Sequence, residues 1–265
     1  MEEEEEEVWD DKLAAVAQKW AKQCVLEHDK NRKIPSYGLH IGQNLAAGHG
    51  NWRQAMSNWY DEVADYRYGE NVNDYLGPDG FFKIGHYTQF VNNSTIRIGC
   101  GFAYCSNTIY GRYYACNYAT GQGRISNPYT EGPRCSACPN TCKGGLCDCK
   151  GKLCLNTGRI NASDCSCICP KIYGGPDCSQ LICPPRDPFY CGTHLVFSDC
   201  EKFFNVPHLC PYMCRVCENP SLPPPPTSTT RRPVFVSPYN CTYRGERATP
   251  DQCRTYGDRG MDKPF

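Results

Sequence analysis

The chain has 265 residues, with 28 basic and 28 acidic side chains and a formal net charge of zero. Outside the acidic run at positions 2–7, 28 basic residues face 22 acidic ones, an excess too mild to indicate a nucleic-acid partner. No apolar run reaches the roughly 18 residues of a transmembrane helix, so we expect no membrane-spanning segment. The 22 cysteines, an even number lying mostly after position 134, predict a disulfide-rich extracellular protein.

The N-terminal residues do not have the sequence pattern expected at the start of an exported protein. Residues 1–7 are a methionine followed by six glutamates, a like-charge run that predicts a disordered segment. A secretory signal is basic and then apolar, which is the opposite pattern. We therefore expect a secreted protein whose signal peptide is missing from this chain.

Two helices are predicted in the first 63 residues. Apolar residues recur at helical spacing between positions 9 and 28, at Leu13, Val16, Trp20 and Cys24. Residues 34–50 are rich in glycine and are predicted to form a loop. A second helix is predicted over 52–63, where the tryptophans share one face with Val63.

A long loop and two strands are expected next. Residues 66–82 form a long loop with glycines and many aromatic residues, and long loops of this kind are as commonly flexible as functional. In residues 95–105 the even positions are large, whereas Gly99 and Gly101 are small. This alternation predicts a strand whose two faces need different clearance, paired with a second strand over 113–119.

Several motifs appear in a recognisable order. The segment 85–91 reads Gly-His-Tyr-Thr-Gln-Phe-Val and is followed by a β-rich run to Gly101 and by Cys116-Asn117-Tyr118. Upstream, Gly-Gln-Asn-Leu stands at 42–45 and Trp-Tyr-Asp-Glu-Val at 59–63. Together they resemble the CAP superfamily of cysteine-rich secretory, antigen 5 and pathogenesis-related proteins. The resemblance implies an α+β fold, a three-layer α-β-α sandwich over residues 8–128, here lacking the family's first helix.

The resemblance also implies disulfides. The family pairs the cysteines that match Cys24 with Cys105 and Cys100 with Cys116. A third family disulfide lacks both halves, because Ala119 stands at one position and no cysteine lies near Gln43.

CAP proteins carry a cleft of two histidines and two glutamates. In this chain the matching residues are His28, Gln43, Glu62 and His86, so one glutamate is replaced by glutamine. His28, Glu62 and His86 are candidate ligands for weakly bound zinc. A purely structural polar cluster is an equally good interpretation.

Three cysteine-rich modules are expected after the CAP domain. Residues 129–148 resemble the hinge of cysteine-rich secretory proteins, and its Cys135-x2-Cys138 favours disulfides over a zinc site. Residues 149–182, including Cys169 and Cys178, resemble an EGF-like module without the acidic lead-in for calcium, so no calcium is predicted. Residues 183–217 resemble an ShK-like toxin module, although Lys202-Phe203 is too close to Cys200 to match the channel-blocking pair.

The remaining C-terminal residues are predicted to be a Pro/Thr-rich linker over 218–240 and a truncated cysteine-containing tail over 241–265. N-glycosylation motifs stand at Asn92, Asn93, Asn161 and Asn240. The modules are expected to be separable, so that reduction unfolds residues after 135 first.

These features predict a secreted multi-module protein that binds an extracellular protein or a lipid or sterol ligand, with no catalytic residues assigned. One alternative is a metal-assisted endopeptidase. It is disfavoured because Gln43 cannot act as a base and no nucleophilic serine or cysteine motif is visible. Another alternative is a toxin-like channel modulator acting through the ShK-like module.

Overall fold

The computed structural model describes residues 7–71, 83–203 and 205–218, and the backbone of three further short segments, Glu2–Glu3, Thr242–Tyr243 and Glu246–Arg247. The chain divides into two compact units, Met1–Asn219 and Pro220–Phe265. In the second unit, β13 (Thr242–Tyr243) pairs with β14 (Glu246–Arg247). The other residues of the predicted tail, nearly all of the predicted linker, Asn240 and loop residues 72–82 lie outside the described ranges.

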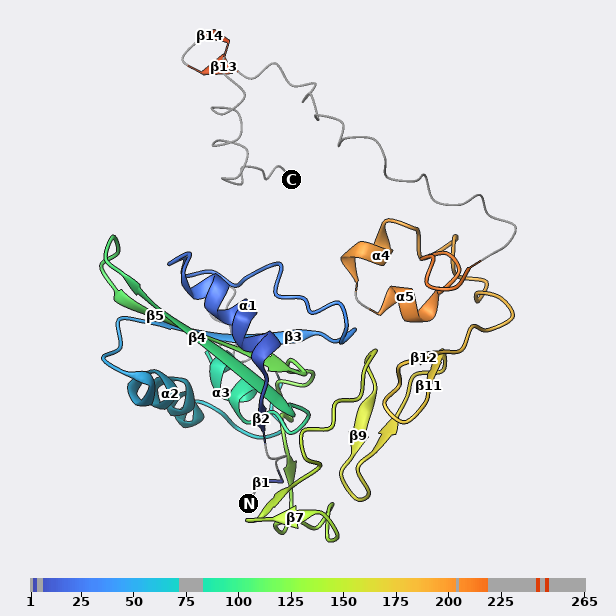
Figure 1. The fold of residues 1–265 in the computed structure, drawn as a ribbon, viewed down its shortest axis with the longest axis horizontal. Coiled ribbons are helices and arrows are strands. Elements are labelled where there is room, and N and C mark those ends of the chain that lie inside the picture. Colours follow the sequence, from blue (N-terminus) through green and yellow to red (C-terminus); the bar gives the residue numbers. More distant parts are fainter. Residues whose placement is uncertain are drawn as a thin grey trace. The chain divides into compact units, whose positions relative to one another are not determined.

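A four-stranded sheet lies between helices on its two faces (Figure 1). Its order is β2-β4-β5-β3, with β2 parallel to β4 and the other pairs antiparallel. Helix α1 covers one face, and α2, the 3-10 helix η1 and α3 cover the other. The predicted three-layer sandwich is confirmed. The elements are β2 (Val8–Trp9), α1 (Asp11–Ala21), β3 (Ile41–Ala47), α2 (Trp52–Asp61), η1 (Glu62–Ala64), α3 (Gly85–Phe90), β4 (Arg97–Cys105) and β5 (Gly111–Ala119).

Two glycines bring α1 close to the sheet. A Cβ atom on Gly99 would lie 2.1 Å from the backbone nitrogen of Ala14, and one on Gly101 would lie 2.3 Å from the Cα of Gln18. Side chains at these positions would push α1 off β4, because real Cβ atoms do not approach so closely. The unequal clearance expected from the alternation in this strand is therefore confirmed.

Helix α1 is shorter than predicted. It ends at Ala21, and its fully buried residues are Leu13, Ala17 and Ala21. Cys24 has a positive φ of 56°, a conformation that does not continue a helix, and its disulfide ties it to Cys105. The apolar periodicity that runs past Ala21 therefore belongs to a turn anchored on the β4–β5 hairpin.

The opposite face is packed by aromatic side chains. Trp59 is fully buried, and its indole N–H donates to the carbonyl oxygen of Leu45 at 2.9 Å. Trp52 meets Tyr114 edge to face, with ring centroids 4.9 Å apart. The predicted core role of the tryptophans on α2 is confirmed.

Two local predictions were wrong. Residues 41–47 form the edge strand β3 and not a loop. Gly42 is needed there because its Cβ would lie 1.9 Å from Oε1 of Gln89. No element was predicted for the segment around His86, which is helical, as α3. Glu2–Glu3, expected to be disordered, pairs as β1 with β6 (Thr130–Glu131).

Ten disulfides join the described cysteines. They include the predicted pairs Cys24–Cys105 and Cys100–Cys116, and both halves of the hinge Cys-x2-Cys motif are bridged. The remaining bridges are Cys149–Cys165, Cys154–Cys167, Cys169–Cys178, Cys183–Cys217, Cys191–Cys210 and Cys200–Cys214. Cys241 and Cys253 lie outside the described residues.

The cysteine-rich modules contain short secondary-structure elements. They are β7 (Cys142–Lys143), β8 (Leu146–Cys147), β9 (Arg159–Asn161), β10 (Ser166–Ile168), β11 (Tyr173–Gly174), β12 (Gln180–Leu181), α4 (Asp199–Lys202) and α5 (Val206–Leu209).

The EGF-like module packs directly on the CAP domain. Leu153 and Leu155 contact the core cluster that contains Leu13, and Arg97 Nε donates to the carbonyl oxygen of Gly151 at 2.8 Å. These contacts give the two modules a shared core, which argues against the expectation that they are separable at this junction. The module boundaries themselves stay predictions.

Candidate functional site

The four residues that the family resemblance assigns to a cleft lie around the edge strand β3. Neighbouring side chains on a strand point to opposite faces of the sheet. Gln43 therefore lies on the α1 side and Asn44 on the side of α2 and α3. Each of these two residues contacts one of the predicted histidines.

On the α1 side, Gln43 holds His28. Its Oε1 lies 3.0 Å from His28 Nδ1 and also accepts from the backbone N–H of Asp29 at 3.0 Å. Its Nε2 donates to Oδ1 of Asn117 at 2.9 Å, which fixes the orientation of the amide. Because Gln43 offers an oxygen to the ring, His28 carries its proton on Nδ1 when neutral.

On the other side, Glu62 holds His86. Oε1 of Glu62 lies 2.7 Å from His86 Nδ1, and Oε2 accepts from the backbone N–H groups of His86 and Tyr87 at 2.8 and 2.9 Å. Asn44 Nδ2 donates to the carbonyl oxygen of His86 at 3.0 Å. The carboxylate thus serves as an acceptor at the first turn of α3 and orients the imidazole ring.

Each candidate histidine has an oxygen acceptor next to its Nδ1. A histidine whose Nδ1–H is held by an oxygen acceptor offers Nε2 as a ligand, with the acceptor orienting it. The charge of His86 lowers the pKa of His28. Joint binding of zinc by the two histidines stays a prediction.

Glu62 does not join the histidines as a third ligand in this structure. Among residues 7–71, 83–203 and 205–218, no three His, Cys, Asp or Glu side chains form a group able to hold a metal ion. Both carboxylate oxygens of Glu62 already accept hydrogen bonds from α3. The expected convergence of His28, Glu62 and His86 as ligands is therefore not found, and zinc binding itself stays a prediction.

His28 resists protonation. Partial burial of the ring lowers its pKa below the ordinary value, the hydrogen bond to Gln43 acts in the opposite sense, and the charges of Arg32 and His86 lower the pKa further. A neutral imidazole is the form that binds a metal ion. Gln43 opposes this state less than a glutamate would, because an amide adds no negative charge beside the ring.

Asn44 and Asn117 were not identified as site residues from the sequence. Both lie within the motifs that suggested the family, Gly-Gln-Asn-Leu and Cys-Asn-Tyr. Both are buried, with 1% and 0% of their surface exposed. Buried asparagines next to a predicted polar site are a signal that could have identified them, because such groups need hydrogen-bond partners.

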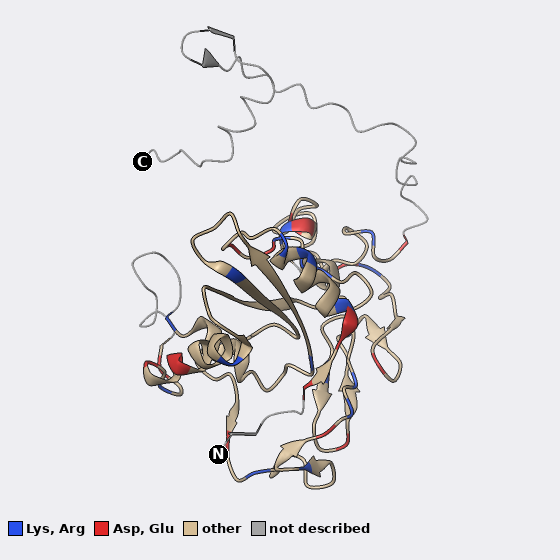
Figure 2. Ribbon diagram, turned by 60° about the vertical axis from the view of Figure 1, so that its left-hand side comes forward, with Lys and Arg blue, Asp and Glu red and all other residues tan. Residues whose placement is uncertain are grey.

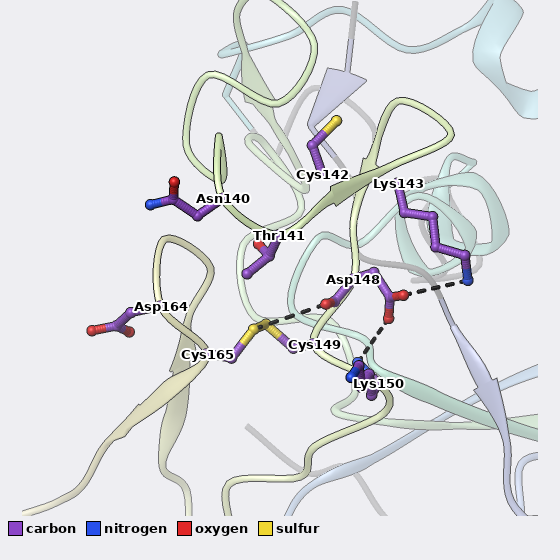
Figure 3. A pocket seen from close by; sticks show the side chains of 9 residues that line it. All are labelled: Asn140, Thr141, Cys142, Lys143, Asp148, Cys149, Lys150, Asp164 and Cys165. Atoms are coloured by element: carbon purple, nitrogen blue, oxygen red, sulfur yellow. Dashed lines mark hydrogen bonds and ion pairs between the residues drawn. A yellow bond between two sulfur atoms is a disulfide. The ribbon is translucent and has the colours of Figure 1, made fainter.

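A second hollow lies between the hinge and the EGF-like module (Figure 3). Oδ1 of Asp148 accepts the backbone N–H of Lys150 at 2.8 Å, and Oδ2 pairs with Lys143 Nζ at 3.3 Å. Asp164 caps its own turn by accepting the N–H of Ser166 at 2.9 Å. The charged groups are satisfied locally, so the hollow offers no evident ligand chemistry.

In the ShK-like module, Asp187 has a structural role. Its two carboxylate oxygens accept the backbone N–H groups of Tyr212 and Met213 at 2.9 and 2.7 Å. Lys202, at the end of α4, and Phe203 are both exposed, with Lys202 Nζ 3.7 Å from Asp199. Neither arrangement decides whether the module acts on a channel.

The N-glycosylation motifs differ in accessibility. Asn92 is buried at 7% exposure, and its Nδ2 donates to Thr95 Oγ1 at 3.0 Å, so its amide is already used in the fold. Asn93 and Asn161 are partly exposed. Glycosylation at these two positions stays a prediction.

Similarity to known proteins agrees with this geometry. The profile of the cysteine-rich secretory protein family, CAP, matches residues 6–118. Cysteine-rich venom protein Mr30 of Conus marmoreus is 38% identical over 220 residues, covering 79% of this chain and 71% of that protein. Cysteine-rich secretory protein 3 of Equus caballus is 38% identical over 146 residues, covering 52% of this chain and 57% of that protein.

Among solved structures, venom allergen-like protein 4 of Schistosoma mansoni aligns with a TM-score of 0.40 and 30% identity, covering 49% of this chain and 77% of that one. None of the helices in the described ranges is long and apolar enough to cross a membrane. The extent of the match to the Conus protein, together with the cleft histidines and the disulfides, shows that this chain belongs to the cysteine-rich secretory protein family.

Proposed function

We propose that this chain is a secreted multi-module protein that acts by extracellular binding and not by catalysis. The observation that carries this proposal is the state of Glu62. It is the one carboxylate among the four cleft residues, and both of its oxygens are used to hold His86 and the first turn of α3. A general base needs a free acceptor within reach of the proton that it removes.

A nucleophilic route has no better support. Each cysteine in the described ranges is in a disulfide, and Gln43 is committed to His28, Asp29 and Asn117. The cleft residues instead form a preorganised frame for two imidazoles. Such a frame suits recognition of a metal ion or of a ligand carrying acceptor groups.

We further propose that His28 Nε2 and His86 Nε2 hold zinc weakly. When bound, zinc would supply a positive charge and open coordination positions to the cleft. The affinity is expected to be low because this site would have two protein nitrogens, whereas zinc sites usually have three or four protein ligands.

Calorimetric zinc titration of the full chain tests the metal proposal. His86→Ala should abolish binding, and Gln43→Glu should strengthen it by about 10- to 100-fold, because a carboxylate acceptor makes the bound histidine a better ligand. Binding unchanged in His86→Ala would show that the metal lies elsewhere. Weaker binding in Gln43→Glu would contradict the role given to position 43.

A protein-cleavage assay tests the absence of catalysis. The full chain and its Glu62→Gln variant are incubated with a denatured protein substrate, with and without zinc. We expect no cleavage above that of a protein-free control. Cleavage by the parent chain that is lost in Glu62→Gln would overturn the binding proposal and favour the endopeptidase alternative.

A further inference from the structure

Exposed apolar side chains gather at the end of the CAP sheet where β4 turns into β5. Ile109, in the turn, is 95% exposed, Tyr104 is 73% exposed and Tyr110 is 44% exposed. Val25 and Leu26, in the segment after α1, are 40% and 51% exposed. We call these five residues the hairpin-tip surface.

Covalent and hydrogen-bonded links hold the two segments of this surface together. The Cys24–Cys105 disulfide joins them, with the Cα atoms 5.7 Å apart, and the hydroxyl of Tyr113 donates to the carbonyl oxygen of Val25. The β4–β5 turn projects past the end of α1 (Figure 1). Val25 and Leu26 therefore accompany Ile109 at the same end of the domain.

The turn that presents Ile109 is internally fixed. The Thr108 backbone N–H and hydroxyl both donate to the carbonyl oxygen of Cys105, at 3.1 and 3.0 Å, and the Gly111 N–H donates to Thr108 Oγ1 at 3.3 Å. A fixed turn loses little further conformational entropy when it docks on a partner. Ile109 is thus an apolar side chain held out into solvent by an ordered turn.

Basic residues outnumber acidic ones near the surface, where exposed Glu27 directly follows Leu26. Residues 19–26 and 104–112 contain Lys19, Lys22 and Arg112 and no carboxylate, and the next acidic residue along the chain is Glu27. Arg112 lies over the ring of Tyr104, 5.8 Å from its centroid. Basic residues mark α1 and the neighbouring hairpin strand in blue in Figure 2.

The hairpin-tip surface has aliphatic side chains at its tip, with tyrosines and basic residues behind them. This order corresponds to the order of the layers in an anionic bilayer. Aliphatic side chains enter the acyl region, tyrosines lie at the headgroup level, and lysine and arginine pair with phosphate and carboxylate headgroups. We propose that the hairpin-tip surface docks on the surface of an anionic phospholipid membrane. This site is distinct from the histidine cleft and does not depend on zinc.

Co-sedimentation of the full chain with vesicles tests the proposal. We expect binding to vesicles of phosphatidylcholine mixed with phosphatidylserine, with weaker binding to phosphatidylcholine alone and weaker binding at high salt. Ile109→Asp should reduce binding by about tenfold or more, because it places a charge where an apolar side chain would insert. Ile109→Ser removes the apolar group without adding a charge and should give a smaller loss.

Phe189→Asp is the matched control. Phe189 is 84% exposed and lies in the ShK-like module, so charging it should leave vesicle binding unchanged. Because Ile109 and Phe189 are both exposed, neither change should disturb folding, which circular dichroism would check. No binding to anionic vesicles, equal binding by Ile109→Asp and the parent chain, or an equal loss in Phe189→Asp would each overturn the proposal.

Discussion

The two faces of the CAP sheet are built on different principles, and the cleft takes one histidine from each. On the α1 face, Gly99 and Gly101 let helix backbone lie directly on strand backbone. On the opposite face, Trp59, Tyr114 and Tyr118 fill a thick aromatic layer. On the α1 face, any added side-chain atom would force the two backbones apart. On the opposite face, packing depends on the volume of the aromatic rings.

The difference extends to the site. The α1 face supplies His28 with a neutral acceptor, Gln43, while the other face supplies His86 with an anionic one, Glu62. Strand β3 separates the two halves, because Gln43 and Asn44 are consecutive residues that point to opposite faces. The two imidazoles on either side of this strand thus differ in the charge of the acceptor that each one contacts.

The largest expected effect comes from filling the α1 contact. Gly101→Val should destabilise the domain by about 3 kcal/mol or more, since the new side chain would overlap the backbone of Gln18. Chemical denaturation gives the free energy of unfolding. Gly123→Ala is the control, because no atom lies within 4 Å of a Cβ placed there. Equal stability of the two variants would show that α1 does not need this close approach.

A smaller effect is expected on the other face from Glu62→Gln. In one orientation of the new side chain, its NH2 group replaces Oε2 and cannot accept the N–H groups of His86 and Tyr87. In the other, the NH2 group replaces Oε1 and the bond to His86 Nδ1 is lost. Loss of such partners at partly buried donors should cost about 2 kcal/mol. The neighbouring Asp61→Asn serves as control, since Asp61 is exposed, and a matching loss there would point to a general charge effect at the end of α2.

The start of α1 should make stability depend on pH. Burial by itself raises the pKa of Asp10, but hydrogen bonds from Tyr37, Leu13, Arg97 and Lys12 outweigh it and hold the pKa below its ordinary value. The ionised carboxylate therefore stabilises the fold above the unfolded-state pKa of about 4, and this contribution is lost as pH falls through the lower folded-state pKa.

Asp10→Asn should thus lower the free energy of unfolding by about 1–2 kcal/mol at neutral pH, and the gap to the parent chain should narrow in acid. Denaturation midpoints measured from pH 2 to 7 check this expectation. Asp11→Asn, at an exposed neighbouring position, is the control. A gap that stays constant down to the lowest pH would contradict the account of Asp10.

The sequence predicted the three layers of the CAP domain better than it predicted where helices and strands begin and end, or the hydrogen bonds of the candidate site. Alternation of glycine with large residues in 97–105 predicted the two faces of β4, because clearance is a local property of side-chain size. Strand β3 was missed because its glycine serves contact with Gln89, which no local pattern reveals. Helix α3 is six residues long and is stabilised by Glu62, 24 positions away from His86.

The four cleft residues came from the family resemblance, and the structure supplied their partners. The roles of Asn44 and Asn117 depend on pairing between distant strands, in which Gln43 stands opposite Asn117. The hydrogen-bonding role of Glu62 was missed for a similar reason. Its hydrogen bonds to backbone N–H groups appear only when α3 is in place.

The account rests on the protonation of His28 and His86, which nitrogen-15 NMR of the imidazole rings measures directly. When the rings are neutral, we expect the proton on Nδ1 in both, with Nε2 unprotonated and shifting when zinc is added. Spectra of His28→Ala and His86→Ala assign the signals. A proton on Nε2 of either ring, or zinc-induced shifts at neither Nε2, would contradict the claim that Gln43 and Glu62 hold the two histidines ready to bind.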